Sequence, residues 1–344
     1  MHSHARRTIV TLVKIALAIG ILAYLIIQAR DGFSRLHERT FSWPFLAGAF
    51  AFSLATALLS FLRWHILIRA LNINIRLFDS LSLGALGFAM NFVSPGSVGG
   101  DFFKAVFLAH GQPGQRTEAV ASVIADRVLG LLTMLTIASA GILATNLLHA
   151  DLAWLQVLSE TILTTTAIGW VGFLLFLFVD ALSGPRIIAL ANRLPLTGRV
   201  VTRFIGAAHL YRHRTSMMAA AFAVSAVMVA CFITSFYFVA RGLGIDAPPW
   251  TQHAVIAPMA GVAGAIPLTP NGLGSTEFTV EKLYLAMPGG AAVVPGDGTF
   301  ASLGRRVTDI VVALLGLAFY LTHKREVQEV MAEAEEAADN PQPA

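Results

Sequence analysis

Long apolar runs separated by short charged segments are the main pattern of this chain. Six of the runs have about 20 residues or more, the length that an α-helix needs to cross a bilayer: residues 8–28, 43–62, 118–145, 154–179, 216–240 and 300–322. Two more runs, residues 77–93 and 251–267, are shorter and rich in glycine, serine or proline. Each is followed by another short apolar piece, residues 102–109 and 278–287. The pattern predicts an all-α polytopic membrane protein with about six full transmembrane helices and two broken helical pairs.

The two broken pairs each contain a loop rich in proline and glycine. The first loop reads SPGSVGGD at residues 94–101, and the second reads TPNGLGSTE at residues 269–277. Both loops end in a carboxylate that opens the next apolar piece. Unwound backbone at membrane depth is tolerated only around a protein-lined cavity, and broken segments in both halves of a membrane protein are typical of a transporter site. The loops therefore mark the candidate functional site.

The distribution of positive charge predicts the topology. Basic residues gather at residues 6–7, 63–76, 186–214 and 323–325. If each short pair enters the membrane and returns to the same face, all four groups lie in the cytoplasm, as the positive-inside rule requires. A very short full crossing by the second piece of each pair gives the same faces, so charge does not separate re-entrant hairpins from thin spans. We expect the bacterial cytoplasmic (inner) membrane, with both termini cytoplasmic.

The same topology makes the two hairpins enter from opposite faces, which is an inverted repeat. The half repeats cover residues 43–180 and 216–322 and are joined by a basic cytoplasmic segment, residues 186–214. Together they form one transmembrane domain, residues 1–322, followed by a short acidic tail, residues 323–344. After its loop, each half has a span with an early arginine, in SVIADRV at residues 122–128 and SLGRRV at residues 302–307.

Composition agrees with a membrane protein and excludes several classes. The 344 residues are 56% hydrophobic and 13% charged, too apolar for a soluble domain. The net charge of +4 lies in the short segments between apolar runs, so it does not indicate nucleic-acid binding. The single cysteine, Cys231, excludes an internal disulfide and a cysteine metal cage. No Walker A, HExxH or GxSxG pattern occurs, so we expect no ATP-driven transport, no catalytic residue, no metal and no cofactor.

Asp101 and Glu277 each stand at the start of a short helix after a glycine-rich turn, and two interpretations remain open. A carboxylate there can cap free backbone N–H groups and the positive end of the helix dipole. Alternatively, the exposed helix N-termini contact an anionic lipid headgroup, as in transporters, and the carboxylates respond to a proton or a positive headgroup.

The charged residues inside the spans also allow two interpretations each. Arg127 lies about nine residues into its span, where a charge costs about 2.5–3.5 kcal/mol, so it either serves the substrate or forms a buried ion pair. Its neighbour Asp126 points about 100° away along the helix and does not simply pair with it. Arg305 and Arg306 lie nearer a span end, so they are either interfacial anchors or partners of Asp309, one turn away, in a local ion pair, which we favour.

Two residues lie one helical turn from the loop carboxylates. Lys104 either neutralises Asp101 or meets a phosphate, and the sequence does not rank these roles. Glu281 follows Glu277 on the same face, for which we favour solvation over a proton relay. The candidate substrate-binding residues are Asn91, Pro95, Gly96, Gly99, Gly100, Asp101, Lys104, Asp126, Arg127, Pro270, Asn271, Gly272, Gly274, Glu277 and Arg306.

Residues 91–101, 121–127 and 267–277 resemble the transmembrane region of lysylphosphatidylglycerol synthases, a family that also includes standalone membrane proteins. The resemblance runs from about the second span to the last. It implies a flippase-like domain that handles lipids, with the Pro/Gly hairpins at its centre. The full synthases add a soluble domain that transfers an aminoacyl group from tRNA, whereas this chain ends in a short acidic tail, so that activity is not expected.

Three functions follow from these observations. The first, which we favour, is translocation or scrambling of a lipid or lipid-linked substrate between leaflets without ATP. The second is an intramembrane enzyme that acts on a lipid, with Asp101 or Glu277 as general base. The third is a non-catalytic partner of a soluble lipid- or glycan-modifying transferase. The expected partners are membrane lipids with anionic or lipid-linked headgroups.

Overall fold

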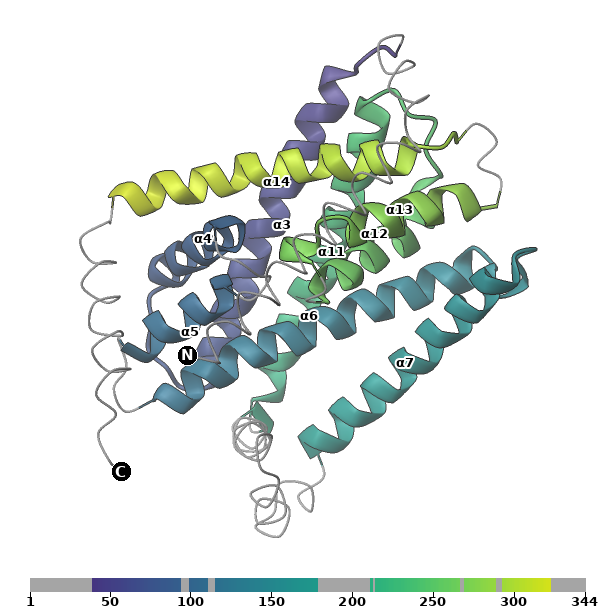
Figure 1. Ribbon diagram of the computed structural model, residues 1–344. Coiled ribbons are helices and arrows are strands. Elements are labelled where there is room, and N and C mark those ends of the chain that lie inside the picture. The colour runs from purple at the N-terminus through teal and green to yellow at the C-terminus, as the bar shows by residue number, and fades with distance from the viewer. Residues whose placement is uncertain are drawn as a thin grey trace, which may run out of the picture.

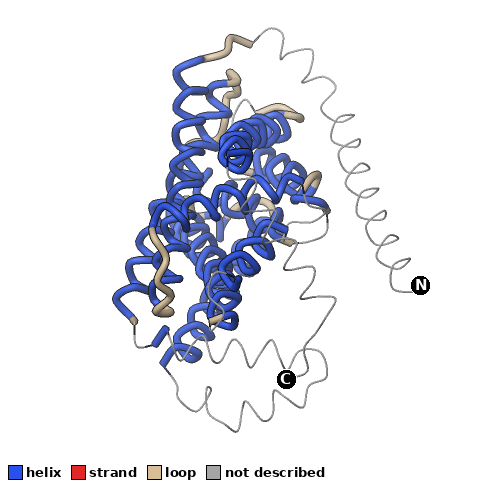
Figure 2. The backbone as a smooth tube through the Cα atoms, turned by 90° about the vertical axis from the view of Figure 1, so that its left-hand side faces the viewer, coloured by secondary structure: helices blue, strands red, loops and turns tan. Residues whose placement is uncertain are grey.

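The computed structural model describes residues 39–93, 99–110, 115–178, 211–212, 214–266, 269–288 and 293–322. Within these ranges all regular structure is helical, with nine α-helices, two short 3₁₀ turns and no strand (Figure 2). The all-α prediction is confirmed there. The expected first span, the acidic tail, most of the basic segment, Pro95 and Gly96 lie outside the described residues.

Four of the expected spans are helices that are long and apolar enough to cross a membrane. They are α3 (Trp43–Ala70), α6 (Arg116–Ala144), α7 (Ala153–Phe178) and α11 (Thr215–Gly242). The expected span at residues 300–322 is also a helix, α14 (Asp297–Thr322), with 26 residues. It does not belong to this apolar group, and it carries Arg305, Arg306 and Asp309 along its length. The described residues therefore contain four clear candidate spans rather than the five expected there.

The two broken pairs are present as short helices. The first pair is α4 (Leu77–Val93) and α5 (Gly99–His110), and the second is α12 (Trp250–Ala265) and α13 (Ser275–Ala286). Their lengths are 17, 12, 16 and 12 residues, each below the length of about 20 that spans a bilayer. In the second pair the 3₁₀ turn η2 (Pro270–Gly272) lies between the helices.

A glycine lets the two helices of each pair approach closely. A Cβ atom on Gly100 would lie 1.9 Å from the carbonyl oxygen of Gly87, across the α4–α5 pair. A Cβ atom on Gly272 would lie 2.5 Å from the Cα of Gly264, at the end of the α12–α13 pair. Any larger residue at either position would force the backbones apart. Both helical pairs thus depend on glycine for the same steric reason.

The helices pack in a repeating pattern around α3 and α11, which lie against each other. The α4–α5 pair contacts α3 through α4 and α6 through α5, and α4 also contacts α14. The α12–α13 pair contacts α11 through α12 and α14 through α13, and α12 also contacts α6. If α3 is exchanged with α11, α6 with α14, and the first short pair with the second, one set of contacts becomes the other. The two pairs lie at opposite ends of the bundle, with α7 outside α6 (Figure 1).

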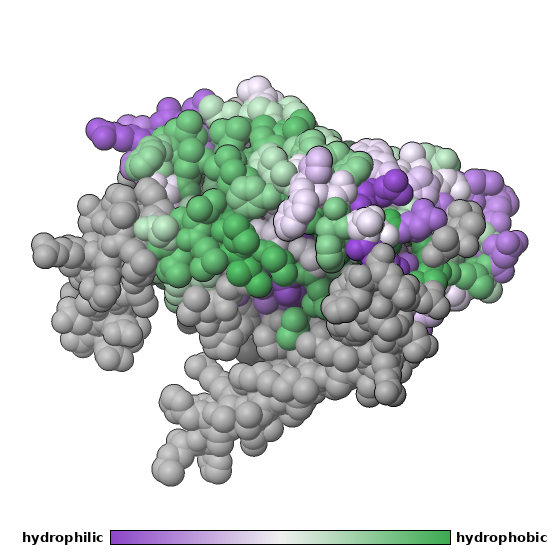
Figure 3. Space-filling model, turned by 90° about the horizontal axis from the view of Figure 1, so that it is seen from above, coloured by the Kyte–Doolittle hydropathy of each residue, from purple (hydrophilic) through white to green (hydrophobic). Residues whose placement is uncertain are grey.

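Apolar side chains fill the interior and also cover much of the surface. Trp64, Phe236 and Tyr284 are almost fully buried. Large apolar residues such as Trp43 and Ile168 are nevertheless exposed, and Figure 3 shows broad apolar areas on the visible face. Apolar patches of this extent on a helical bundle mark a surface that contacts membrane lipid. The helices therefore place charged residues inside a molecule whose outside is apolar.

Candidate functional site

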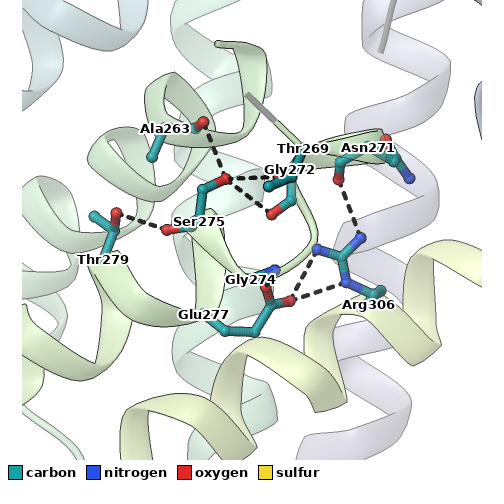
Figure 4. Close-up of polar contacts among 9 residues, drawn as sticks. All are labelled: Ala263, Thr269, Asn271, Gly272, Gly274, Ser275, Glu277, Thr279 and Arg306. Atoms are coloured by element: carbon teal, nitrogen blue, oxygen red, sulfur yellow. Dashed lines mark hydrogen bonds and ion pairs between the residues drawn. The ribbon is translucent and has the colours of Figure 1, made fainter. Parts of the chain in front are cut away.

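The second Pro/Gly loop is held by Glu277 (Figure 4). Asn271, Gly272 and Gly274 have positive φ angles of 48°, 65° and 86°, which glycine and asparagine adopt most readily. The loop turns back onto α13, where the fully buried Glu277 accepts the N–H of Gly274 on Oε2 at 2.6 Å. The predicted capping role of Glu277 is confirmed.

Glu277 also pairs with Arg306 of α14. Its Oε1 atom accepts Nε of Arg306 at 3.0 Å and Nη2 at 2.8 Å. The remaining Nη1 atom donates to the carbonyl oxygen of Asn271 at 3.2 Å. Arg306 therefore ties α14 to both the loop and the first turn of α13. Its ion-pair partner is Glu277 rather than the expected Asp309, which pairs with Arg305, and the alternative of an interfacial anchor is wrong. A buried carboxylate is stable here because it has three N–H donors and an opposite charge.

The first loop has an equivalent pair. Asp101, in the first turn of α5, accepts a hydrogen bond from Nε of Arg127 of α6. The N–H of Gly100 donates to Oδ1 of Asn91 at 3.0 Å, which joins the two ends of the loop. Gly99 is the first residue of α5. The ion pair expected as one alternative for Arg127 is present, but only its Asp101 side is buried: the two side chains are 51% and 10% exposed. In both halves a carboxylate after the loop binds an arginine of the next long helix.

Next to each of these arginines lies a charged residue that turns toward α3. Asp126 binds Arg63 of α3, with 2.8 Å between Oδ1 and Nε, and Arg63 also donates to Ser225 of α11 at 3.3 Å. This confirms that Asp126 does not pair with its neighbour Arg127. Arg305 donates through Nη1 to Oγ of Ser53, also on α3, at 2.9 Å.

The burial and contacts of Arg305 and Glu281 decide three further predictions about charged residues. Arg305 is 4% exposed, so its assignment as an interfacial anchor is wrong, whereas its local ion pair with Asp309 is confirmed. Glu281 is 1% exposed, so the expected solvation is wrong. Its oxygens accept the N–H groups of Gly296 at 2.7 Å and Thr299 at 2.9 Å, which caps the start of α14.

Lys104 is buried, and its ammonium lies over two aromatic rings of α3. Its ammonium lies 5.2 Å from the centroid of the Trp64 ring and 6.0 Å from that of Phe61. Among the described residues it makes no ion pair, because Asp101 is occupied by Arg127 and Asp126 by Arg63. Of the two predicted roles, direct neutralisation of Asp101 is therefore not seen. The two ring contacts place the ammonium over aromatic faces, which attract a cation.

A cavity of about 220 Å³ lies between the end of α4 and the second loop. It is reached by Asn91 at the end of α4, by Asn271 of the second loop and by Arg306. Its other lining residues are Phe88, Phe232, Phe236, Ala260, Gly261, Gly264, Thr276, Ser302, Arg305 and Asp309. Nε of Arg305 is buried there with no hydrogen-bond partner in the described part of the chain. A buried donor left free in a polar cavity needs a water molecule or a polar ligand atom.

The predicted site residues thus fall into two groups. Asn91, Asn271 and Arg306 line the cavity, with Pro270, Gly272, Gly274 and Glu277 shaping the loop beside it. Gly100, Asp101, Lys104, Asp126 and Arg127 form a second group around α5 and α6. No three His, Cys, Asp or Glu side chains of the described ranges come together as metal ligands.

Arg63 and Ser53 are site residues that the sequence did not reveal. The apolar run on α3 was expected to end at residue 62, which left Arg63 among the flanking cytoplasmic charges. The helix continues to Ala70, and Arg63 is 5% exposed within it. An arginine followed by Trp64 and a further apolar turn was the available signal.

The chain matches a protein-family model, that of the lysylphosphatidylglycerol synthase TM region, over residues 11–316. The chain belongs to this family. The match includes both loops, both carboxylate–arginine pairs and most of α14, so the resemblance seen in the sequence is confirmed. The lysylphosphatidylglycerol synthase transmembrane family is flippase-like, and the chain is a multi-pass integral membrane protein of that family. No curated protein matches the sequence closely.

Proposed function

We propose that this protein moves a lipid or lipid-linked molecule between the two leaflets without ATP, as a translocase or scramblase. The main support is a polar cavity lined by Arg306 of one carboxylate–arginine pair, together with a second such pair at the start of α5, inside a molecule with an apolar surface. Ionisable residues within a membrane domain are costly, and they commonly line the path of a polar substrate. Acyl chains would remain in the bilayer while the headgroup passes the loops.

We further propose that α4–α5 and α12–α13 are re-entrant hairpins in an inverted repeat. At 1.5 Å per residue, the 12-residue helices α5 and α13 are only about 18 Å long, against about 30 Å for the hydrocarbon core. The exchange of α3 with α11 and of α6 with α14, described above, supports a pseudo-two-fold relation between the halves. Such repeats place the substrate site near the middle of the membrane.

The proposed orientation has the end of α3 and the start of α11 in the cytoplasm. Arg69 lies in the last turn of α3, and Arg214 precedes α11. Nη2 of Arg214 donates to Oδ1 of Asn72 at 2.8 Å, so these basic ends lie together. Under the positive-inside rule, a cluster of arginines at one end favours the cytoplasmic side. Bacterial inner-membrane localisation, with both termini in the cytoplasm, is part of the same proposal.

The arginines of the two pairs are the groups that would bind the headgroup. A guanidinium presents a planar fork of N–H donors that suits phosphate as well as carboxylate. A headgroup phosphate can therefore share or replace the carboxylate at Arg127 and at Arg306, and the free Nε of Arg305 supplies a further donor in the cavity. If a phosphate displaced Glu277 from Arg306, the carboxylate would keep the backbone N–H of Gly274 as a partner. The described residues show no such N–H partner for Asp101.

Reconstitution in phospholipid vesicles tests this function. Fluorescent phospholipids of several headgroups are incorporated, and their accessibility to a membrane-impermeant quencher is followed over time. We expect faster exchange than in empty vesicles, with a loss of at least tenfold in Arg127→Gln and Arg306→Gln.

Arg241→Gln is the matched control, since Arg241 lies outside both sites in an exposed, long ion pair of 3.9 Å with Asp246. This variant should exchange lipid at the wild-type rate. No acceleration over empty vesicles for any headgroup would refute the proposal.

A further inference from the structure

A second hollow lies on the other side of the α12–α13 pair, against the first two turns of α7. It is a groove of about 590 Å³, and its walls are mainly apolar, with Trp154 and Val157 from α7, Met259 and Ile266 from α12, and Phe278 from α13. Trp154, Val157 and Phe278 are 45%, 62% and 41% exposed. The groove is therefore open sideways, toward the space that lipid fills around a membrane protein.

Lys282 is the charged residue in the lining of this groove. Its ammonium lies 5.6 Å from the centroid of the Phe278 ring, and among the described residues it has no carboxylate partner within ion-pair distance. Lys282 lies four residues before the end of α13 at Ala286, about 6 Å along the helix axis. A lysine at this distance from a helix end can extend its ammonium to the membrane surface.

Lys282 and Trp154 lie at the same end of the molecule. Trp154 is the second residue of α7, and Figure 1 places the start of α7 and the far end of α13 on the same side of the bundle. Tryptophan and lysine are the residues that commonly sit at the membrane–water interface. The groove thus runs from a cationic mouth to an apolar inner end at Ile266, near the second Pro/Gly loop. This order of charge and apolar surface matches an anionic phospholipid.

We propose that the groove binds one phospholipid with a net anionic headgroup, its phosphate at Lys282 and one acyl chain along α7 and α12. An acyl chain gains little by leaving the bilayer for an apolar groove, so the headgroup must supply the preference. One lysine near a membrane surface contributes about 1 kcal/mol toward an anionic lipid, which corresponds to about a fivefold preference over a zwitterionic lipid.

The position of the groove links this lipid to the proposed path. Ala263 of α12 lines the groove, whereas the next residue, Gly264, lines the cavity beside the second loop. On α13, Thr279 faces the groove and Thr276 the cavity. Thr279 also donates to the carbonyl oxygen of Ser275 at 2.8 Å, at the start of the helix (Figure 4). The α12–α13 pair therefore faces the groove on one side and the cavity on the other. Only the statement that the bound lipid goes on to be moved rests on the proposed function.

Fluorescence quenching of Trp154 tests the binding itself. The protein has five tryptophans, so the Trp154 contribution is taken as the difference between the wild type and Trp154→Phe. Both are reconstituted in vesicles of phosphatidylcholine and phosphatidylglycerol, with bromine on the acyl chains of one lipid at a time. We expect the quenching of Trp154 to give about a fivefold higher relative binding constant for phosphatidylglycerol.

Variants of the cation separate specific binding from general attraction. Lys282→Gln should reduce the ratio to about one, Lys282→Arg should keep it, and Arg241→Gln, which removes a positive charge outside the groove, should leave it unchanged. A wild-type ratio of one, or a ratio that Lys282→Gln does not lower, would overturn the proposal. Quenching measures lipid binding at equilibrium, whereas vesicle exchange measures lipid movement between leaflets. A failure of the binding proposal can therefore be told from a failure of the proposed function.

Discussion

The pair between Arg306 and Glu277 offers the sharpest test of how this protein tolerates charge in its interior. In Arg306→Met, Glu277 would stay buried at 0% exposure and keep only the N–H of Gly274 as donor. Removing one partner of a buried ion pair costs about 3–5 kcal/mol, because the other charge is left uncompensated. We expect a loss of stability of that size for Arg306→Met.

The reverse substitution should cost less. In Glu277→Gln the side-chain oxygen can still accept the N–H of Gly274, and Arg306, whose side chain is 19% exposed, can turn toward the cavity. We expect a loss of about 1–3 kcal/mol, the usual cost of a broken buried hydrogen bond. The double variant contains no unpaired charge, so its loss should be smaller than the sum of the two single losses by at least about 1 kcal/mol.

Unfolding in mild detergent, followed by circular dichroism across a titration with sodium dodecyl sulfate, measures these differences. Arg241→Gln should stay within about 1 kcal/mol of the wild type, because its partner Asp246 is exposed and 3.9 Å away. Additive losses in the double variant, or an Arg306→Met protein as stable as this control, would refute the reasoning.

Two further predictions concern packing and topology. Gly100→Ala should destabilise the protein by more than about 2 kcal/mol in the same assay, because the new Cβ would lie 1.9 Å from the Gly87 oxygen; Gly172→Ala is the control, with no atom within 4 Å, and equal stability of the two variants would contradict this prediction. In a Cys231→Ser background, single cysteines at residues 110–117 should react with membrane-impermeant reagents only from the cytoplasm, and those at residues 293–295 only from the opposite side. Labelling of both from one side would exclude the inverted repeat.

The parts of the fold that depend on local pattern could be predicted from the sequence. Apolar length located α3, α6, α7 and α11, and the Pro/Gly loops located the breaks between the short helices. Pairings across the fold could not be predicted in this way. Asp126 meets Arg63 across 63 positions, and Glu281 caps a turn 15 positions away, so neither partner is visible in a helical periodicity. The cavity between α4 and the second loop likewise arises only when both halves are packed together.

Arg305 and Asp126 both contact α3, and the distance between these two contacts along the helix affects the energy of moving a headgroup across the membrane. Ser53, the contact of Arg305, and Arg63, the contact of Asp126, are ten residues apart, which is about 15 Å along the helix axis. That is about half of the hydrocarbon thickness of a bilayer. On the proposed route, a headgroup would therefore move about 15 Å from one polar contact to the next. Each such step has a smaller desolvation barrier than one uninterrupted crossing.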